Sequence, residues 1–130
     1  MISIYGSSGF IGSKYLEIFR KDCFPIDREE RFPKSENILY FISTTHNYNI
    51  FENPYLDIDT NLKVLIESLE ACREYSLATN KNIVFNFISS WFVYGKTSLP
   101  AKETNHCSPK GFYSITKKCA EDLIISYCNT

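Results

Sequence analysis

The sequence has no excess of charge of one sign and no long apolar run. Its 130 residues carry 14 Lys and Arg against 15 Asp and Glu, for a net charge of −1. Proteins that bind DNA or RNA usually present a basic face to the phosphates, so no nucleic-acid partner is expected. The longest apolar stretches, such as residues 83–85 and then 87–88, are far shorter than the roughly 20 residues of a membrane-spanning helix, so no membrane partner is expected either.

A secretory signal and paired cysteines are also missing. The N-terminus has neither the basic region nor the long apolar segment of a signal peptide, which predicts a cytoplasmic protein. The cysteines include no CxxC pair, so we expect reduced thiols that mostly pack in the interior, rather than a disulfide framework or a zinc site. They are Cys23, Cys72, Cys107, Cys119 and Cys128. The two histidines, His46 and His106, lie far apart without further ligands at suitable spacing, so no metal site is predicted.

Length and composition fit one globular domain, in which strand-like and helix-like patterns alternate. Short apolar runs predict four strands, at residues 1–5, 23–26, 37–43 and 83–88. Pro25 weakens the second of these, and the near-continuous run of the fourth is typical of a strand buried on both faces. Apolar residues three and four apart predict helices after the first strand, from Asp59 with an Asp or Thr cap, and over about 113–128.

This order of elements predicts an α/β fold with a Rossmann-like, doubly wound parallel sheet of about four strands. Ligands of such sheets bind at the carboxyl ends of the strands, near the point where the strand order reverses. A polar loop that follows the third strand as far as about Pro54 could cover such a ligand. With four strands only, the last would present an unpaired apolar edge, which favours self-association.

A glycine-rich turn joins the first predicted strand to the first helix. Its sequence is Gly6-Ser7-Ser8-Gly9-Phe10-Ile11-Gly12, a GxxGxxG pattern. Glycines there let the backbone approach a pyrophosphate, which the free amides of the helix N-terminus attract; a turn without functional meaning is the alternative. Asp27 follows Gly6 by 21 residues, close to the spacing at which an acid binds an adenosine ribose. The turn lacks the Lys and Ser or Thr of a P-loop, which disfavours ATP or GTP hydrolysis.

The predicted last helix carries Tyr113 and Lys117 four residues apart. This spacing places both on one helix face, where the ammonium would favour the ionised form of the phenol. Ser90 follows the fourth strand, where a ligand crevice is expected, and its hydroxyl could bind a substrate hydroxyl or carbonyl. A solvent-exposed Tyr and Lys pair, and a serine that only ends a strand, are the structural alternatives.

The three motifs together resemble the extended short-chain dehydrogenase/reductase family, in its NAD-dependent epimerase/dehydratase branch. They are the GxxGxxG turn, the segment Ser89-Ser90-Trp91-Phe92-Val93-Tyr94-Gly95 and the segment Phe112-Tyr113-Ser114-Ile115-Thr116-Lys117-Lys118. The family also has an acid before the Tyr motif and an asparagine in the central helix, matched by Glu103 and Asn61.

The resemblance implies a catalytic set of Ser90, Tyr113 and Lys117. Tyr113 would act as the base toward a sugar hydroxyl that Ser90 orients, while Lys117 would favour the phenolate and hold the nicotinamide ribose. The pyrophosphate would bind at Gly6, Gly9, Phe10, Ile11 and Gly12. Asp27 on the adenosine ribose favours NAD as cofactor, whereas Arg28 could hold a 2′-phosphate, so NADP stays possible.

Two departures from the family pattern limit the function that the resemblance implies. Family dehydratases have an Asp-Glu pair where this chain has Trp91 and Phe92, so an epimerase or a keto-sugar reductase acting on a UDP-, GDP- or similar nucleotide sugar is expected. Family members also continue beyond residue 130, so residues 1–130 would be the NAD(P)-binding domain with the catalytic residues, and the C-terminal substrate domain would be absent. The alternative is a catalytically silent dinucleotide-binding fragment that needs a partner or the missing domain.

The resemblance also implies an assembly. Many relatives form homodimers in which two long helices of each subunit build a four-helix bundle. In this sequence these helices would span about residues 61–75 and 113–128.

Overall fold

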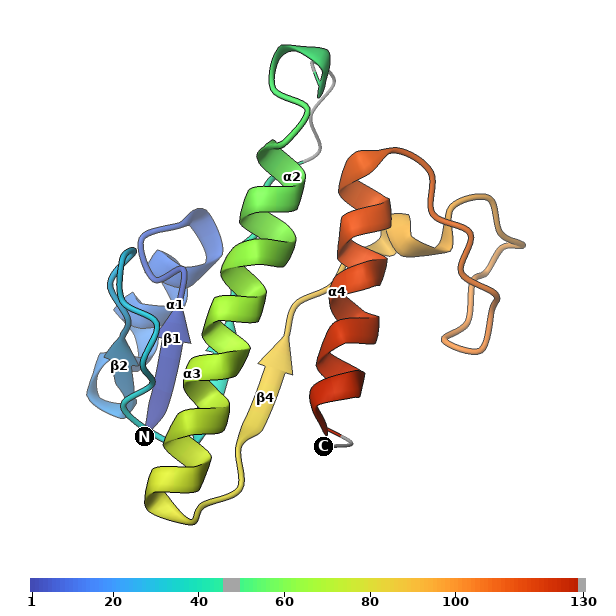
Figure 1. Cartoon of the computed structure of the whole chain (residues 1–130). Coiled ribbons are helices and arrows are strands. Elements are labelled where there is room, and N and C mark those ends of the chain that lie inside the picture. The colour runs from blue at the N-terminus through green and yellow to red at the C-terminus, as the bar shows by residue number, and fades with distance from the viewer. Residues whose placement is uncertain (46–49, 129–130) are drawn as a thin grey trace. The chain divides into compact units, whose positions relative to one another are not determined.

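Four short parallel strands form one sheet in the order β2-β1-β3-β4 in the computed structural model, which describes residues 1–45 and 50–128 (Figure 1). The strands are β1 (Ile2–Tyr5), β2 (Cys23–Pro25), β3 (Asn37–Tyr40) and β4 (Val84–Phe87). The pairing is parallel throughout, with Tyr5 opposite Tyr40 and Tyr40 opposite Phe87. The predicted Rossmann-like α/β sheet is confirmed.

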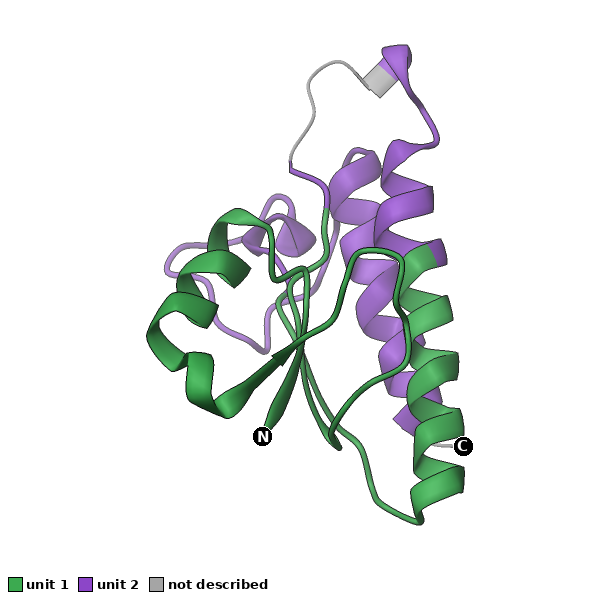
Figure 2. Ribbon diagram, turned by 90° about the vertical axis from the view of Figure 1, so that its left-hand side faces the viewer, with its two compact units in different colours: residues 1–43, 64–88 green, residues 44–63, 89–130 purple. Residues whose placement is uncertain are grey.

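The chain divides into two units that interleave along the sequence (Figure 2). Unit 1 comprises residues 1–43 and 64–88 and holds the whole sheet, whereas unit 2 comprises residues 44–63 and 89–130 and is mostly helical. Each unit is described by itself below.

In unit 1, helices α1 (Phe10–Phe19) and α3 (Val64–Thr79) lie on opposite faces of the sheet (Figure 2). The 3-10 turn η1 (Arg20–Asp22) leads from α1 into β2. The core consists of side chains that are no more than 1% exposed, namely Ile4, Tyr5, Ile38, Tyr40 and Leu65. Aromatic rings extend this core along one face of the sheet, because the Tyr40 ring centroid lies 5.6 Å from Tyr5 and 5.5 Å from Phe85.

The strand containing Pro25 forms as predicted because it lies at the edge of the sheet. Pro25 pairs with Ile4, and the next backbone amide, that of Ile26, donates to the Ile4 carbonyl at 2.9 Å. A proline can occupy an edge strand since one side of the strand has no ladder to complete.

The prediction that the last strand is buried on both faces is wrong. β4 is the other edge of the sheet, and Val84 and Ile88 are 53% and 44% exposed while Phe85 and Phe87 face Tyr40. Within unit 1, α1 contacts β2 at the opposite end of the strand order, so it does not cover β4. The apolar run therefore has only one buried side here, although the predicted apolar edge is present.

Unit 2 contains the helical segments α2 (Leu56–Ile58), η3 (Asp59–Lys63) and α4 (Phe112–Cys128), with the short turns η2 (Ile50–Glu52) and η4 (Trp91–Tyr94). The predicted Asp or Thr cap near Asp59 is wrong, because the helix begins at Leu56 after Tyr55 and η3 is a wide π-helical turn. The earlier start is anchored by Asp57, a buried carboxylate that accepts a short hydrogen bond from the Thr44 hydroxyl.

Two buried tyrosines of unit 1 differ in one contact. The Tyr5 hydroxyl donates to the Arg31 carbonyl at 2.6 Å, whereas the Tyr40 hydroxyl, which faces Ser68, has no hydrogen-bond partner among the described residues. Tyr5→Phe should therefore lower the free energy of unfolding by about 1 kcal/mol, while Tyr40→Phe should leave it unchanged or raise it. Urea unfolding of both variants tests this, and equal losses in the two would contradict it.

Candidate functional site

The predicted site residues fall into two sets, one in each unit. The glycine turn, Asp27 and Arg28 belong to unit 1, whereas Ser90, Tyr113 and Lys117 belong to unit 2. Each set is held together by contacts inside its own unit.

The glycine turn is a tight backbone crossing centred on the Gly6 carbonyl. Gly6 has a φ of +78°, and the Gly9 amide donates to the Gly6 carbonyl at 3.0 Å. A Cβ at Gly12 would stand 2.2 Å from that same oxygen, a distance that no side chain can occupy. Packing of helix against strand therefore requires the first and third glycines.

Gly9, in contrast, is exposed and less tightly packed. A Cβ there would meet one atom, the Gly6 carbonyl oxygen, at a close but less severe 3.3 Å. Gly9 caps α1 without any side-chain hydrogen bond, the first turn of α1 carries no acidic residue, and Phe10 is 95% exposed. Backbone amides at such a helix N-terminus attract anions, so the turn fits the pyrophosphate of a dinucleotide.

Asp27 and Arg28 lie at the same edge of the sheet as the glycine turn. Both follow β2, whose neighbour β1 leads into Gly6, so the two segments leave the carboxyl ends of adjacent parallel strands. The side chains of Asp27 and Arg28 are exposed, and the Asp27 carbonyl closes a turn by accepting from the Glu30 amide at 3.0 Å. This placement suits an acid that binds an adenosine ribose.

In unit 2, Ser90 caps the turn η4 and this turn meets the start of α4. The Ser90 hydroxyl oxygen accepts from the Phe92 amide at 3.3 Å, and the Phe92 ring lies edge-on to the Tyr113 ring with centroids 6.2 Å apart. The turn closes at Gly95, where a Cβ would stand 1.9 Å from the Ser108 carbonyl oxygen. The close approach at Ser108 explains the glycine at position 95, and the turn that Ser90 caps contacts Tyr113 through the Phe92 ring.

Lys117 follows Tyr113 by one helical turn and is buried, with 2% of its surface exposed. Burial lowers the pKa of its ammonium to about 8, and the carboxylate of Glu121 on the next turn acts in the opposite direction. The charged form still prevails at pH 7. A buried ammonium beside a phenol can stabilise negative charge on that phenol.

A buried polar network behind Tyr113 is the part of the site that motif reasoning missed. The Asn61 side-chain amide donates to Thr44 Oγ1 at 2.9 Å and to Thr116 Oγ1 at 3.0 Å, and Thr116 donates to the Tyr113 carbonyl at 3.0 Å. Asn61 also accepts from the Thr44 amide at 2.8 Å. The family resemblance pointed to Asn61, but only the fold shows that it holds the turn of α4 that carries Tyr113.

Other residues that the sequence singles out differ in their exposure. Trp91 and Phe92 are 55% and 49% exposed on the short turn η4. The cysteines are all free, but only Cys23 and Cys72 are buried, so most do not pack in the interior; burial raises the pKa of the Cys72 thiol to about 11. Glu103 is exposed in the segment before α4.

Among residues 1–45 and 50–128, no group of three His, Cys, Asp or Glu side chains could hold a metal ion, and His46 lies outside the described residues. Within the same ranges, no helix is both long and apolar enough to cross a membrane.

A family model described as GDP-mannose 4,6 dehydratase matches residues 33–130, well over half of the chain. The chain belongs to this family. This family is of the NAD-dependent epimerase/dehydratase type, which confirms the predicted resemblance to the extended short-chain dehydrogenases/reductases. The family's description names a dehydratase, whereas Trp91 and Phe92 occupy the positions where the resemblance led us to expect the Asp-Glu pair of a dehydratase. No curated protein sequence matches this chain.

Several solved structures share the fold of this chain, which is a member of the GDP-mannose 4,6 dehydratase family. UDP-glucuronic acid 4-epimerase from Bacillus cereus, in complex with UDP-glucuronic acid and NAD, is 20% identical with a TM-score of 0.80, over 99% of this chain and 52% of that one. RMD from Pseudomonas aeruginosa, complexed with NADPH, is 23% identical with a TM-score of 0.77, over 97% and 47%. UDP-glucose 4-epimerase from Brucella ovis, with NAD, is 21% identical with a TM-score of 0.78, over 99% and 48%. The chain thus spans about half the length of these proteins.

The contrast between Gly12 and Gly9 can be tested by adding one methyl group to each. Gly12→Ala should lower the free energy of unfolding by about 3 kcal/mol because the new Cβ forces the Gly6 carbonyl away. The backbone conformation at Gly9 is one that alanine adopts freely, so Gly9→Ala should lower the free energy of unfolding by less than about 1 kcal/mol. Denaturant unfolding measures both, and equal losses would show that Gly9 is also a packing position.

Proposed function

We propose that this chain is the dinucleotide-binding and catalytic domain of an NAD(P)-dependent nucleotide-sugar epimerase or keto-sugar reductase. The observation that carries the proposal is the arrangement in unit 2. There Tyr113 and the buried Lys117 lie one turn apart on α4, and the turn that Ser90 caps contacts Tyr113 through Phe92. A base, a buried cation and a hydroxyl on neighbouring elements are what proton transfer to or from a sugar hydroxyl needs.

Each unit contributes its own candidate residues for the cofactor. The backbone of Gly6, Gly9, Phe10, Ile11 and Gly12 would bind the pyrophosphate, and the exposed start of α1, which no side chain caps, supports this. Asp27 would bind the adenosine ribose of NAD, Arg28 could instead bind the phosphate of NADP, and Tyr113 and Lys117 would contact the nicotinamide ribose. When bound, the dinucleotide supplies hydride acceptance and return. Structures of similar fold contain NAD or NADPH, which supports this choice.

The chain's own residues would carry the proton. Tyr113 would remove it from a sugar hydroxyl, and Ser90 would orient that hydroxyl by a hydrogen bond. The ammonium of Lys117 would stabilise the phenolate form of Tyr113, which accepts that proton and becomes the neutral phenol. The Asn61–Thr116 contacts would fix the backbone of the Tyr113 turn so that the phenol keeps one position.

The substrate class follows from the family and from the missing dehydratase pair. The family model names a GDP sugar, and proteins of similar fold are named for UDP-glucose and UDP-glucuronic acid, so a UDP- or GDP-sugar is the proposed substrate. Elimination of water needs acid and base groups that Trp91 and Phe92 do not provide. An epimerase or a reductase needs only the hydride acceptor and the tyrosine base.

A cytoplasmic location is part of the proposal, because the five cysteines are free and such usage is typical of reducing compartments.

Turnover and binding test the function separately. NAD or NADP should raise the stability of the chain, by about 2.7 kcal/mol at a hundredfold excess over its Kd, and UDP- or GDP-sugars should be converted. Tyr113→Phe should reduce that turnover by at least about 100-fold without loss of cofactor binding. Tyr127→Phe, three to four turns along the same helix, is the matched control and should keep full activity.

The two readouts separate the alternatives. Dinucleotide binding without turnover by the wild-type chain would favour the catalytically silent module instead. Full turnover by Tyr113→Phe would contradict the assignment of the base.

We also propose that the protein is a homodimer whose contact includes an apolar groove on unit 2. The groove has a volume of about 520 Å³ and is lined by Ile58, Leu62, Phe112, Ile115 and Cys119, among others. Ile58, Phe112 and Ile115 are 42%, 42% and 51% exposed, and exposed apolar patches of this kind mark protein contacts. The family resemblance supports a second copy as the occupant.

Ile115→Lys should convert a dimer to a monomer in sedimentation experiments, because it places a charge inside the apolar groove. Leu99→Lys is the control, since Leu99 is 78% exposed, lies outside both helices of the expected bundle and does not line the groove. A wild-type chain that sediments as a monomer would refute the dimer.

A further inference from the structure

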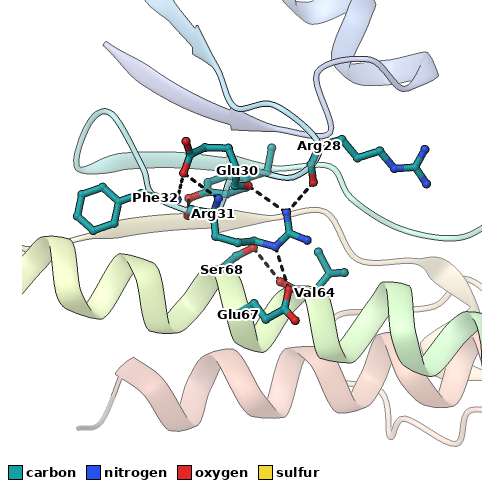
Figure 3. A network of polar contacts seen from close by, with 8 residues as sticks. Arg28, Glu30, Arg31, Phe32, Val64, Glu67 and Ser68 are labelled. Carbon is teal, nitrogen blue, oxygen red and sulfur yellow. Dashed lines mark hydrogen bonds and ion pairs between the residues drawn. The ribbon is translucent and has the colours of Figure 1, made fainter.

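The segment that follows Asp27 and Arg28 is organised by one side chain, that of Arg31. Its Nη1 donates to the Arg28 carbonyl at 2.6 Å and to the Glu30 carbonyl at 3.0 Å (Figure 3). Its Nε donates to Glu67 Oε2 on α3 at 3.0 Å. One guanidinium therefore ties the backbone of the Asp27–Glu30 turn to a helix of the same unit.

Further contacts fix the position of Arg31 itself. Its carbonyl accepts the Tyr5 hydroxyl at 2.6 Å, and Tyr5 is the residue that precedes the glycine turn. The Glu30 carboxylate accepts the backbone amides of Arg31 and Phe32 at 3.1 Å and 2.9 Å. These bonds lower the pKa of Glu30, so it stays charged at neutral pH. The turn after β2 is thus linked to the end of β1 as well as to α3.

The pair of Arg31 and Glu67 is too exposed to serve mainly as a stabilising contact. The two side chains are 23% and 42% exposed, and ion pairs in such positions contribute little to the free energy of unfolding. What the pair does is local, because the same guanidinium holds two carbonyls of the turn at fixed positions. The side chain of Arg28 extends away from this cluster, whereas its carbonyl is held inside it (Figure 3).

We propose that Arg31 and Glu67 are positioning residues that hold Asp27 in place for the adenosine ribose, and so set the preference between NAD and NADP. The inference rests on the proposed function. Neither residue needs to contact the cofactor, because both act through the backbone of the turn.

The two cofactors depend on this positioning to different degrees. Asp27 is short and would bind the ribose diol through directional hydrogen bonds, which weaken steeply when the backbone moves. Arg28 is long, and its charge would attract a 2′-phosphate over a range of backbone positions. Loosening the turn should therefore weaken NAD more than NADP.

Glu67→Gln and Arg31→Lys test the proposal through the Kd of NAD and of NADP, measured by titration calorimetry on the full chain. Each variant should raise the Kd of NAD about tenfold, the loss expected when one polar contact is misaligned, while the Kd of NADP rises less than about threefold. The ratio of the two constants is the decisive readout, because a general loss of folded protein would not change it.

Glu70→Gln is the matched control. Glu70 lies one turn further along α3 and pairs with Arg73 of the same helix at 2.8 Å, so its ion pair does not reach the turn after β2. It should leave both constants unchanged. Suppose that the wild-type chain binds NAD, and that Glu67→Gln and Arg31→Lys both have the same ratio of the NAD and NADP dissociation constants as the wild type. In that case the positioning role is wrong while the proposed function stands. If the wild-type chain binds neither dinucleotide, the proposed function fails and this inference with it.

Discussion

The carbonyl of Gly6 occupies the space in which a Cβ of residue 12 would stand, and unit 1 is arranged around this contact. It brings the start of α1 directly onto the end of β1, with no side chain between them. The amides of the helix N-terminus are then left at the carboxyl edge of the sheet, next to the residues that follow β2. A requirement of packing thereby creates a surface suited to an anion.

In unit 2 the corresponding constraint is the burial of Lys117. The residue is 2% exposed, and burial lowers the pKa of its ammonium to about 8 while the Glu121 carboxylate acts in the opposite direction. The Asn61, Thr44 and Thr116 contacts then fix the adjacent helical turn. Desolvation makes this cation a stronger electrostatic influence on its surroundings than a surface lysine would be, which is why its position matters for the chemistry proposed at Tyr113.

Local patterns in the sequence predicted most of the elements but not the contacts between distant ones. Strands such as β1 and β3 and helix α4 follow from short-range periodicity, and the GxxGxxG pattern follows from the packing that it satisfies. The burial of β4 could not be inferred from its apolar run, because which strand becomes an edge depends on the order of the whole sheet. The Asn61–Thr116 and Arg31–Glu67 contacts join residues 55 and 36 positions apart, and no spacing rule predicts such pairs.

The interleaving of the two units has a consequence for the genetics of this domain. The chain passes between them after residues 43, 63 and 88, so each unit is assembled from two separate stretches of sequence. No single cut in the gene can therefore yield one unit intact without the other. A recombination event that exchanged only unit 1 between relatives would need several crossovers, whereas the two units together can be inherited as one piece.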